Sequence, residues 1–222
     1  MGSEVEANGD AGYLLLREAI VKGDLAPNQR LLEAEMSSTF RLPRAAVRTA
    51  LVRLEQEGLV EREPYRGARV RLITEQEAVE ILQARAALEG LAARHAARHC
   101  GPAEADELWE IVARQRAALD QGDLIGASDV NAELHARIVE LSQHTTAQRL
   151  VRTLSSQMVR FQFRTILIPG RPGQSHEEHR AIVEAVTAGD QAGAEAAMRR
   201  HLDAVAQALA ESPAAGRAQR TT

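Results

Sequence analysis

Apolar residues recur at the helical period in three segments of the first 60 residues, which predicts three short helices. The predicted helices span residues 14–21, 33–40 and 43–57. The third carries Val47 and Leu51 on one side, starts at Pro43, and stops before Gly58, a residue typical of helix C-termini. Two alternating segments follow, LVERE and ARVRLI, and the proline and glycine of the intervening PYRG predict a turn. Residues 11–73 are therefore predicted to form three helices and a β-hairpin.

A second region begins at Thr74, where TEQE predicts a capping box in which Thr74 and Glu77 bond to each other's backbone. Helical periodicity then continues, with predicted helices at 75–99, 103–120, 129–142, 146–168, 175–188 and 191–212. The segment PGRPGQ is predicted to be a loop, and Ser175 with Glu178 a capping box for the helix after it. Residues 74–212 should form an all-helical bundle of six or seven helices. Residues 1–10 are expected to be a disordered leader and 213–222 a disordered tail.

Composition supports a mainly α fold, because Ala, Leu and Arg abound and aromatic residues make up only 3% of the 222 residues. The charge is uneven along the chain. Residues 11–73 carry 11 Lys or Arg and 8 Asp or Glu, whereas residues 74–222 carry 16 and 20. A basic front and an acidic back fit a DNA-binding domain joined to a regulatory one. Cys100 is the single cysteine, and the chain contains no apolar run long enough for a membrane span and no signal peptide, so we expect a cytoplasmic protein without a membrane partner.

Most of the third predicted helix lies in residues 41–53, a run that contains four arginines and no acidic residue. In a helix-turn-helix protein the second helix of the motif enters the major groove by its N-terminus, which here carries Arg44, Ala45 and Arg48. Arg66 and Gly67 at the tip of the hairpin are placed to approach the neighbouring minor groove. The alternative is a solvated face on which these arginines pair with nearby glutamates. The order of helix, turn, basic helix and basic hairpin favours double-stranded DNA.

Residues 16–70 resemble the winged helix-turn-helix domain of GntR-family transcription regulators. The resemblance rests on LREAIVKGDLAPNQRLLEAEMSSTFRLPRAAVRTALVRLEQEGLVEREPYRGARV. It implies that Arg44 and Arg48 contact operator DNA and that Arg66 and Gly67 lie at the wing. The chain departs from the family pattern at Pro43, where a serine is usual, and at Ala46, where a proline is usual. Pro43 has no side-chain oxygen with which to cap the helix or bind a phosphate.

The second region is similar to the FCD ligand-binding domain of the FadR subfamily in QARAALEGLAARHAA, NAELHARIVELSQH, SHEEHRAIVEAVTAGD and AMRRHL. The family's metal-binding pattern falls on Asn131, His135, His179 and His201. Residues 131 and 135 lie four apart, so one helix face presents both. Three imidazoles and one oxygen suit a divalent transition metal such as zinc, nickel, manganese or iron. The pattern has aspartate where this chain has Asn131, a neutral and weaker ligand. The alternative is a core in which the three histidines are satisfied by hydrogen bonds.

Family similarity makes Arg85 a candidate clamp for the carboxylate of an effector, and Arg164 a second candidate. A salt bridge between Arg85 and Glu89 is the alternative for Arg85. We therefore expect a ligand-responsive repressor, not an enzyme, that binds a pseudo-palindromic operator as a homodimer and senses a small carboxylate metabolite at a metal site. Two other functions stay open: a metal-dependent hydrolase, for which no HExxH motif is present, and an architectural DNA-binding protein with an inert helical domain.

Overall fold

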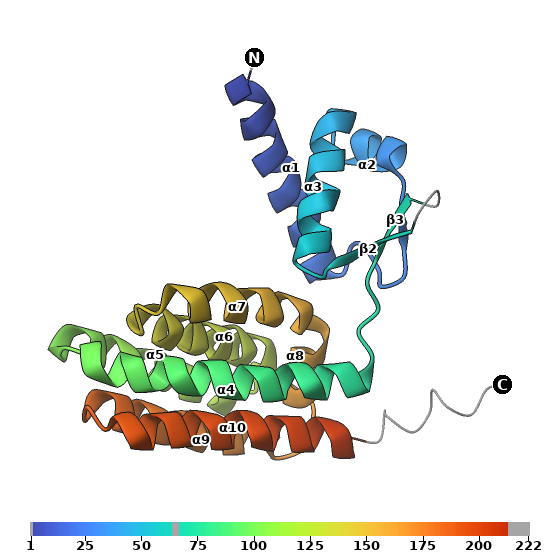
Figure 1. The fold of residues 1–222 in the computed structure, drawn as a ribbon. Coiled ribbons are helices and arrows are strands. Elements are labelled where there is room, and N and C mark those ends of the chain that lie inside the picture. Colours follow the sequence, from blue (N-terminus) through green and yellow to red (C-terminus); the bar gives the residue numbers. More distant parts are fainter. Residues whose placement is uncertain (1, 64–66, 213–222) are drawn as a thin grey trace. The chain divides into compact units, whose positions relative to one another are not determined.

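A computed structural model describes residues 2–63 and 67–212 and divides the chain into two compact units, residues 1–73 and 74–222. The described residues form ten helices and one three-stranded sheet (Figure 1). The predicted mainly α fold, with a winged helix-turn-helix followed by a helical bundle, is confirmed. Among the described residues, no helix combines the length and apolar character needed to cross a membrane.

The first unit contains α1 (Gly2–Lys22), β1 (Arg30–Leu31), α2 (Glu33–Thr39), α3 (Arg44–Gln56), β2 (Val60–Glu63) and β3 (Gly67–Val70). Helix α1 begins well before the predicted Leu14, so residues 2–10 are helical where a disordered leader was expected. No proline lies between residues 2 and 22, and a helix that has formed at one end can extend at little cost. Strand β1 was not predicted. It pairs antiparallel with β3, which gives the strand order β1-β3-β2.

The core of the first unit lies between α1, α3 and the sheet. Its fully buried side chains include Leu16, Leu31 and Leu54, and the periodic apolar residues of the predicted third helix are buried as expected. Gly12 brings α1 close to the start of α3: a Cβ at this glycine would lie 3.3 Å from Leu42 Cδ1. The core therefore holds the buried side of α3 and leaves its other side exposed.

The second unit contains α4 (Glu75–His99), α5 (Pro102–Asp120), α6 (Leu124–Leu141), α7 (Thr145–Gln157), α8 (Val159–Ile166), α9 (Arg171–Thr187) and α10 (Gln191–Glu211). The long helices α4 and α10 lie side by side along the bundle, and α6 and α9 also pack against α4 (Figure 1). Alanines fill much of α4's buried side, where Ala92, Ala93 and Ala96 are fully buried. Small side chains let the neighbouring helices approach closely.

Local predictions for the bundle have mixed outcomes. The cap at Thr74 is confirmed, since its Oγ1 accepts a hydrogen bond from the Glu77 amide at 3.1 Å. The predicted helix 146–168 is instead two helices that meet at Met158. The predicted loop PGRPGQ and the capping box after it are wrong, because α9 already begins at Arg171. Gly170 precedes it with φ 79°, and a proline in the first helical turn gives up no hydrogen bond there.

Candidate metal centre and nucleic-acid interface

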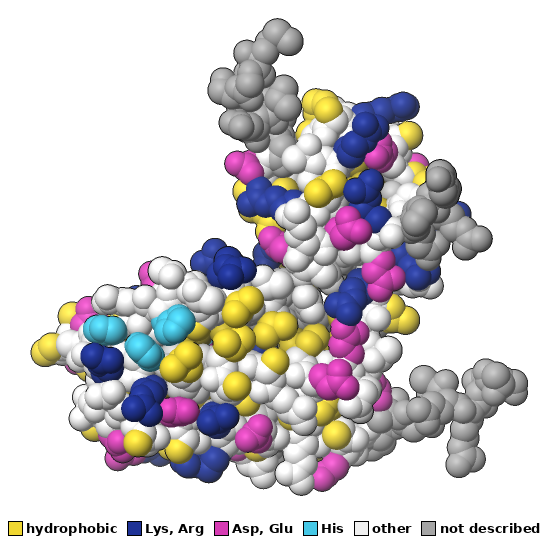
Figure 2. All heavy atoms as spheres, in the orientation of Figure 1, with side chains coloured by type: hydrophobic (Ala, Val, Ile, Leu, Met, Phe, Trp, Pro, Cys, Tyr) yellow, Lys and Arg dark blue, Asp and Glu magenta, His cyan; other side chains and the backbone are white. Residues whose placement is uncertain are grey.

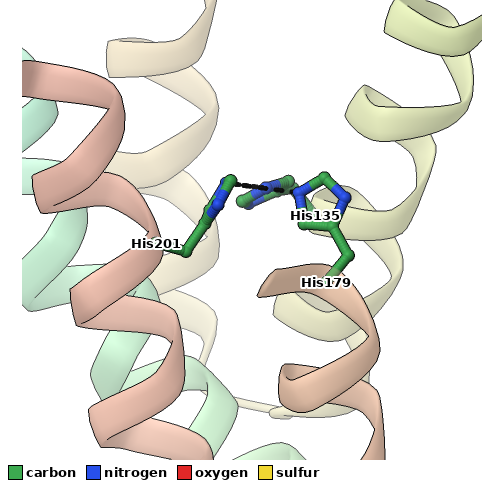
Figure 3. A group of neighbouring side chains, drawn as sticks. All are labelled: His135, His179 and His201. Carbon is green, nitrogen blue, oxygen red and sulfur yellow. Dashed lines mark hydrogen bonds between the residues drawn. The ribbon is translucent and has the colours of Figure 1, made fainter. Parts of the chain in front are cut away.

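Three helices of the second unit bring three imidazoles together. His135 comes from α6, His179 from α9 and His201 from α10, and all three side chains are buried. The rings converge (Figure 3), with His201 Nε2 lying 3.2 Å from Nε2 of both His135 and His179. One nitrogen from each ring lies within 4.8 Å of the others. The predicted meeting of these residues is therefore present in the structure.

A hydrogen bond at Nδ1 orients each ring. Glu89 Oε2 lies 2.6 Å from His135 Nδ1, Gln115 Oε1 lies 2.9 Å from His179 Nδ1, and Glu178 Oε2 lies 2.7 Å from His201 Nδ1. Because these oxygens act as acceptors, each Nδ1 carries the proton and each Nε2 of a neutral ring carries a lone pair. The three lone pairs face one another. Hydrogen bonds of this kind on the outer nitrogen are typical of metal-binding histidines.

Two of the three nitrogen–nitrogen distances match those expected around a metal ion. Zinc–nitrogen bonds of about 2.0–2.1 Å at tetrahedral angles place neighbouring nitrogens about 3.3 Å apart. The Nε2 atom of His201 lies 3.2 Å from the Nε2 atoms of His135 and His179. Without a cation or a shared proton, lone pairs at this distance repel each other. The donor set therefore fits a divalent ion between the rings, and a proton shared between two rings would give the hydrogen-bonded core of the alternative.

The pKa shifts of His179, His201 and Glu89 agree with two neutral imidazoles near a charged carboxylate. Burial, followed by the charge of neighbouring imidazoles, lowers the pKa of His179 and His201 well below its usual value. Burial alone would raise the pKa of Glu89, but the charges and hydrogen bonds of Arg85 and His135 outweigh it and lower that pKa to about 2. At neutral pH, His179 and His201 can therefore offer lone pairs, and Glu89 is ionised.

Two buried arginines complete the hydrogen-bonded network around the rings. Arg85 donates from Nε to Glu89 Oε1 at 2.6 Å, which is the salt bridge considered as the alternative for this arginine. Arg171 donates from Nη1 and Nη2 to the two oxygens of Glu178, at 2.9 and 2.6 Å. Each carboxylate therefore links one guanidinium to one imidazole. The buried Nε of Arg171 has no hydrogen-bond partner among the described residues.

A cavity of about 70 Å³ opens beside the imidazoles. Arg85 and Arg171 line it together with His135 and His201, and so does Asn131, one turn before His135 on α6. Apolar side chains of α4, α8 and α10 form much of the remaining wall. A cavity needs roughly 10–15 Å³ to hold one water molecule, so a cavity of about 70 Å³ has room for a small organic molecule.

Several residues of this site were not predicted from the sequence, and one predicted residue does not line the cavity. Arg164 bonds Glu75 Oε1 at 2.6 Å and is not among the residues that line the cavity. Gln115 carries no spacing signal, since it lies on a separate helix. Arg171 and Glu178 were hidden by the predicted loop and capping box. Glu89 lies on α4 and His135 on α6, 46 residues apart, so only the fold brings them together.

The candidate DNA-reading residues lie on the exposed side of α3. Arg44, Ala45 and Arg48 are all exposed near its N-terminus, and Pro43 occupies the N-cap position without a side-chain cap. Arg48 Nε and Nη2 donate to Glu33 of α2 at 3.1 and 3.0 Å. Basic and acidic side chains are interspersed over the visible face of this unit (Figure 2). Arg48 therefore forms an ion pair of the kind that the alternative expects, with Glu33 as its partner, and the N-terminal residues of α3 stay exposed.

The wing is only partly described. Arg66, predicted at its tip, lies outside the described residues. Gly67 begins β3, is exposed, and has φ 85°, a backbone conformation that favours glycine. Among the described residues, no heavy atom outside the glycine and its chain neighbours lies within 4 Å of a Cβ built at this position, so the positive φ is the observed reason for glycine here.

The first unit is a winged helix-turn-helix with an exposed basic helix, and the second is a helical bundle around a cavity lined by two arginines. This combination is typical of a DNA-binding transcription regulator. The family of bacterial regulatory proteins called gntR matches residues 11–70, and the FCD domain matches residues 80–204. The chain belongs to the GntR family, and its second unit contains an FCD domain. The members of this family are transcription regulators and not enzymes, so the hydrolase alternative is wrong.

Characterised and solved relatives agree with this assignment. The HTH-type transcriptional repressor GlaR of Escherichia coli K12 is 30% identical, covering 86% of this chain and 90% of its own length. The HTH-type transcriptional repressor RspR of the same organism is 25% identical, covering 89% and 86%. The solved E. coli protein McbR/YncC superimposes with a TM-score of 0.76 at 20% identity, covering 92% of this chain and 97% of that one, which shows a shared fold.

Proposed function

We propose that this protein is a ligand-responsive repressor whose DNA binding is controlled by a small carboxylate metabolite, bound at a metal ion in the second unit. The observation that carries the proposal is the set of three Nε2 lone pairs, oriented by acceptors at each Nδ1, beside a cavity lined by Arg85 and Arg171. GlaR and RspR are both named as transcriptional repressors, which supports repression rather than activation of transcription.

His135, His179 and His201 would hold the metal ion, for which zinc, nickel, manganese and iron are the candidates. When bound, the ion supplies a Lewis-acidic position that accepts a carboxylate oxygen. Asn131 lies on the cavity wall and offers an amide oxygen as a further, neutral ligand. Arg85, held by Glu89, presents its guanidinium to the same cavity and is the proposed clamp for the effector's carboxylate.

On the DNA side, Arg44 and Arg48 would read the major groove and Arg66 and Gly67 would approach the minor groove. One such domain contacts too few base pairs to select one site in a genome. We therefore propose a homodimer on a pseudo-palindromic operator. Glu33 would release Arg48 to the DNA, since the pair is exposed and costs little to break.

Metal content tests the sensing half of the proposal. We expect about one equivalent of metal per chain in the purified protein by elemental analysis. His179→Ala should lose it, because that variant removes one of three ligands, whereas His99→Ala, at an exposed position in the last turn of α4, should keep it. Equal metal in His179→Ala and wild type would remove the site.

Operator binding tests the DNA half. An operator is first selected from random duplexes with the wild-type protein. Arg44→Ala or Arg48→Ala should weaken binding to this operator by roughly 1–3 kcal/mol. Arg116→Ala, which alters an exposed pair in the second unit, is the control and should bind as wild type does. Unchanged binding by both α3 variants in a mobility-shift assay would refute the recognition role. A metal-loaded protein whose operator affinity responds to no carboxylate would instead favour the architectural alternative.

A further inference from the structure

The charges around the cavity leave it short of negative charge once a divalent ion is bound. Of the described residues that line it, Arg85 and Arg171 are charged and none is a carboxylate. Glu89 and Glu178 lie behind these arginines and cancel their two positive charges. The described part of the site is then neutral, so a divalent ion would add two positive charges that no described residue compensates.

At Asn131 the chain has a neutral amide, where a carboxylate would supply negative charge beside the metal ion. Asn131 lies on the wall of the cavity one helical turn from His135, where a carboxylate would cancel one charge and the amide cancels none. An uncompensated charge in a buried site is costly, and a bound ligand of opposite charge is the simplest way to remove that cost.

Arg171 supplies a second observation. The residue is only 4% exposed, and its Nε has no hydrogen-bond partner among the described residues, although both terminal nitrogens bind Glu178. A buried N–H without an acceptor is unfavourable and rare. Because Arg171 lines the cavity, a ligand oxygen placed there would satisfy the unpaired N–H.

The wall of the cavity indicates an organic ligand. Between its polar groups it presents apolar side chains that include Leu82, Phe161, Ile166 and Val205. These surfaces match a short hydrocarbon chain better than a compact inorganic anion, which would leave them against solvent. A volume of about 70 Å³ suits three- or four-carbon acids.

From these observations we propose that the effector is a small dicarboxylate, with one carboxylate on the metal ion and the other received by the arginines of the cavity, and that Asn131 sets this preference for two negative charges. The inference rests on the metal site of the proposed function. It assigns Asn131 as a specificity-determining residue and Arg171 as a ligand contact.

The test compares succinate with butyrate, which have equal chain length and differ in one carboxylate. Metal-loaded protein is titrated calorimetrically with each acid at matched ionic strength, and metal content is measured before and after. We expect wild type to bind succinate at least about tenfold more tightly than butyrate. Asn131→Asp should reduce that ratio about tenfold, since the new carboxylate supplies one of the two charges. Asn131→Ala, which stays neutral, should keep the ratio.

The possible failures are distinguishable. Wild-type protein without metal would overturn both this inference and the metal site. Metal-loaded wild type that binds the two acids equally would overturn the dicarboxylate alone and leave the metal site standing, as would an unchanged ratio in a metal-loaded Asn131→Asp variant. Binding of neither acid would overturn this inference together with the proposed carboxylate effector.

Discussion

Glu89 offers the sharpest test of how the metal centre is built. It is fully buried on α4 and accepts hydrogen bonds from His135 Nδ1 and Arg85 Nε, both at 2.6 Å. Glu89→Gln keeps the size of the side chain and one acceptor but removes the negative charge. The variant therefore leaves Arg85 buried beside a neutral group and weakens the hydrogen bond that orients His135.

Two routes give similar magnitudes for the cost to the metal-free protein. A carboxyl whose pKa falls from 4.5 to about 2 on folding stabilises the folded state by about 3 kcal/mol at neutral pH. Breaking a buried ion pair by removing one partner costs about 3–5 kcal/mol. We therefore expect Glu89→Gln to lower the free energy of unfolding by about 3 kcal/mol. Metal affinity should fall by about 10–100-fold, the usual effect of losing an outer hydrogen bond to a ligand.

Urea unfolding with a chelator present measures the first quantity, and competition with a metal-binding dye measures the second. Because the folded pKa of Glu89 is depressed, its contribution is complete above pH 4.5 and is lost as the pH falls toward about 2. The difference between wild type and Glu89→Gln should therefore shrink over that range of pH.

The matched control is Glu133→Gln, which removes a carboxylate from an exposed pair with Arg114. An exposed pair contributes less than about 1 kcal/mol, so this variant should unfold almost as wild type does. A Glu89→Gln protein that loses no more stability than the control, and holds metal as tightly as wild type, would refute the argued network of Arg85, Glu89 and His135.

Metal-free protein should lose stability as the pH falls below about 6.5, because the lowered pKa values of His179 and His201 let the unfolded chain bind more protons; urea unfolding at pH 8 and pH 6 checks this. Gln143→Gly should raise the melting temperature, with a gain of about 0.5–1 kcal/mol, because Gln143 follows α6 with φ 53°, a conformation that costs glycine least. Arg164→Gln should leave carboxylate affinity within about twofold of wild type, because Arg164 is not among the residues that line the cavity. Arg171→Lys should lower that affinity about tenfold, because Arg171 does line it. Calorimetry on metal-loaded proteins measures both affinities.

The helices of the fold were predictable because their apolar residues repeat at the helical period and because caps mark their ends. Thr74 caps α4 as predicted, and Asp190 caps α10 directly before the predicted start of that helix at residue 191. The break at Met158 was not predictable, since the apolar pattern continues through it and no proline or glycine marks it. Strand β1 has two residues, too few for an alternating pattern to emerge.

The segment around Arg171 shows why proline and glycine are ambiguous signals. Both residues interrupt the interior of a helix, and this favours a loop. The same pair also suits a helix start, where Gly170 takes a positive φ and Pro172 lies in the first turn. Only packing decides between the two, and here it buries Arg171 against Glu178.

The candidate site was predictable as far as its ligands and no further. The spacings around His135, His179 and His201 follow a family pattern, so their convergence could be expected. Their hydrogen-bond partners come from other helices or from a position with an apparent capping role, and no sequence spacing links Gln115 to His179. Partners of this kind depend on how helices pack, which a single sequence does not reveal.

The same network connects stability to sensing. Three lone pairs held face to face are unfavourable without a cation or a shared proton, so binding an ion between the neutral rings would stabilise the bundle. The carboxylates that orient two of the rings also hold Arg85 and Arg171. A ligand that draws on either guanidinium must therefore alter the hydrogen bond to a metal-binding imidazole. Effector affinity and metal affinity should for this reason depend on each other, and by linkage the coupling must be equal in both directions.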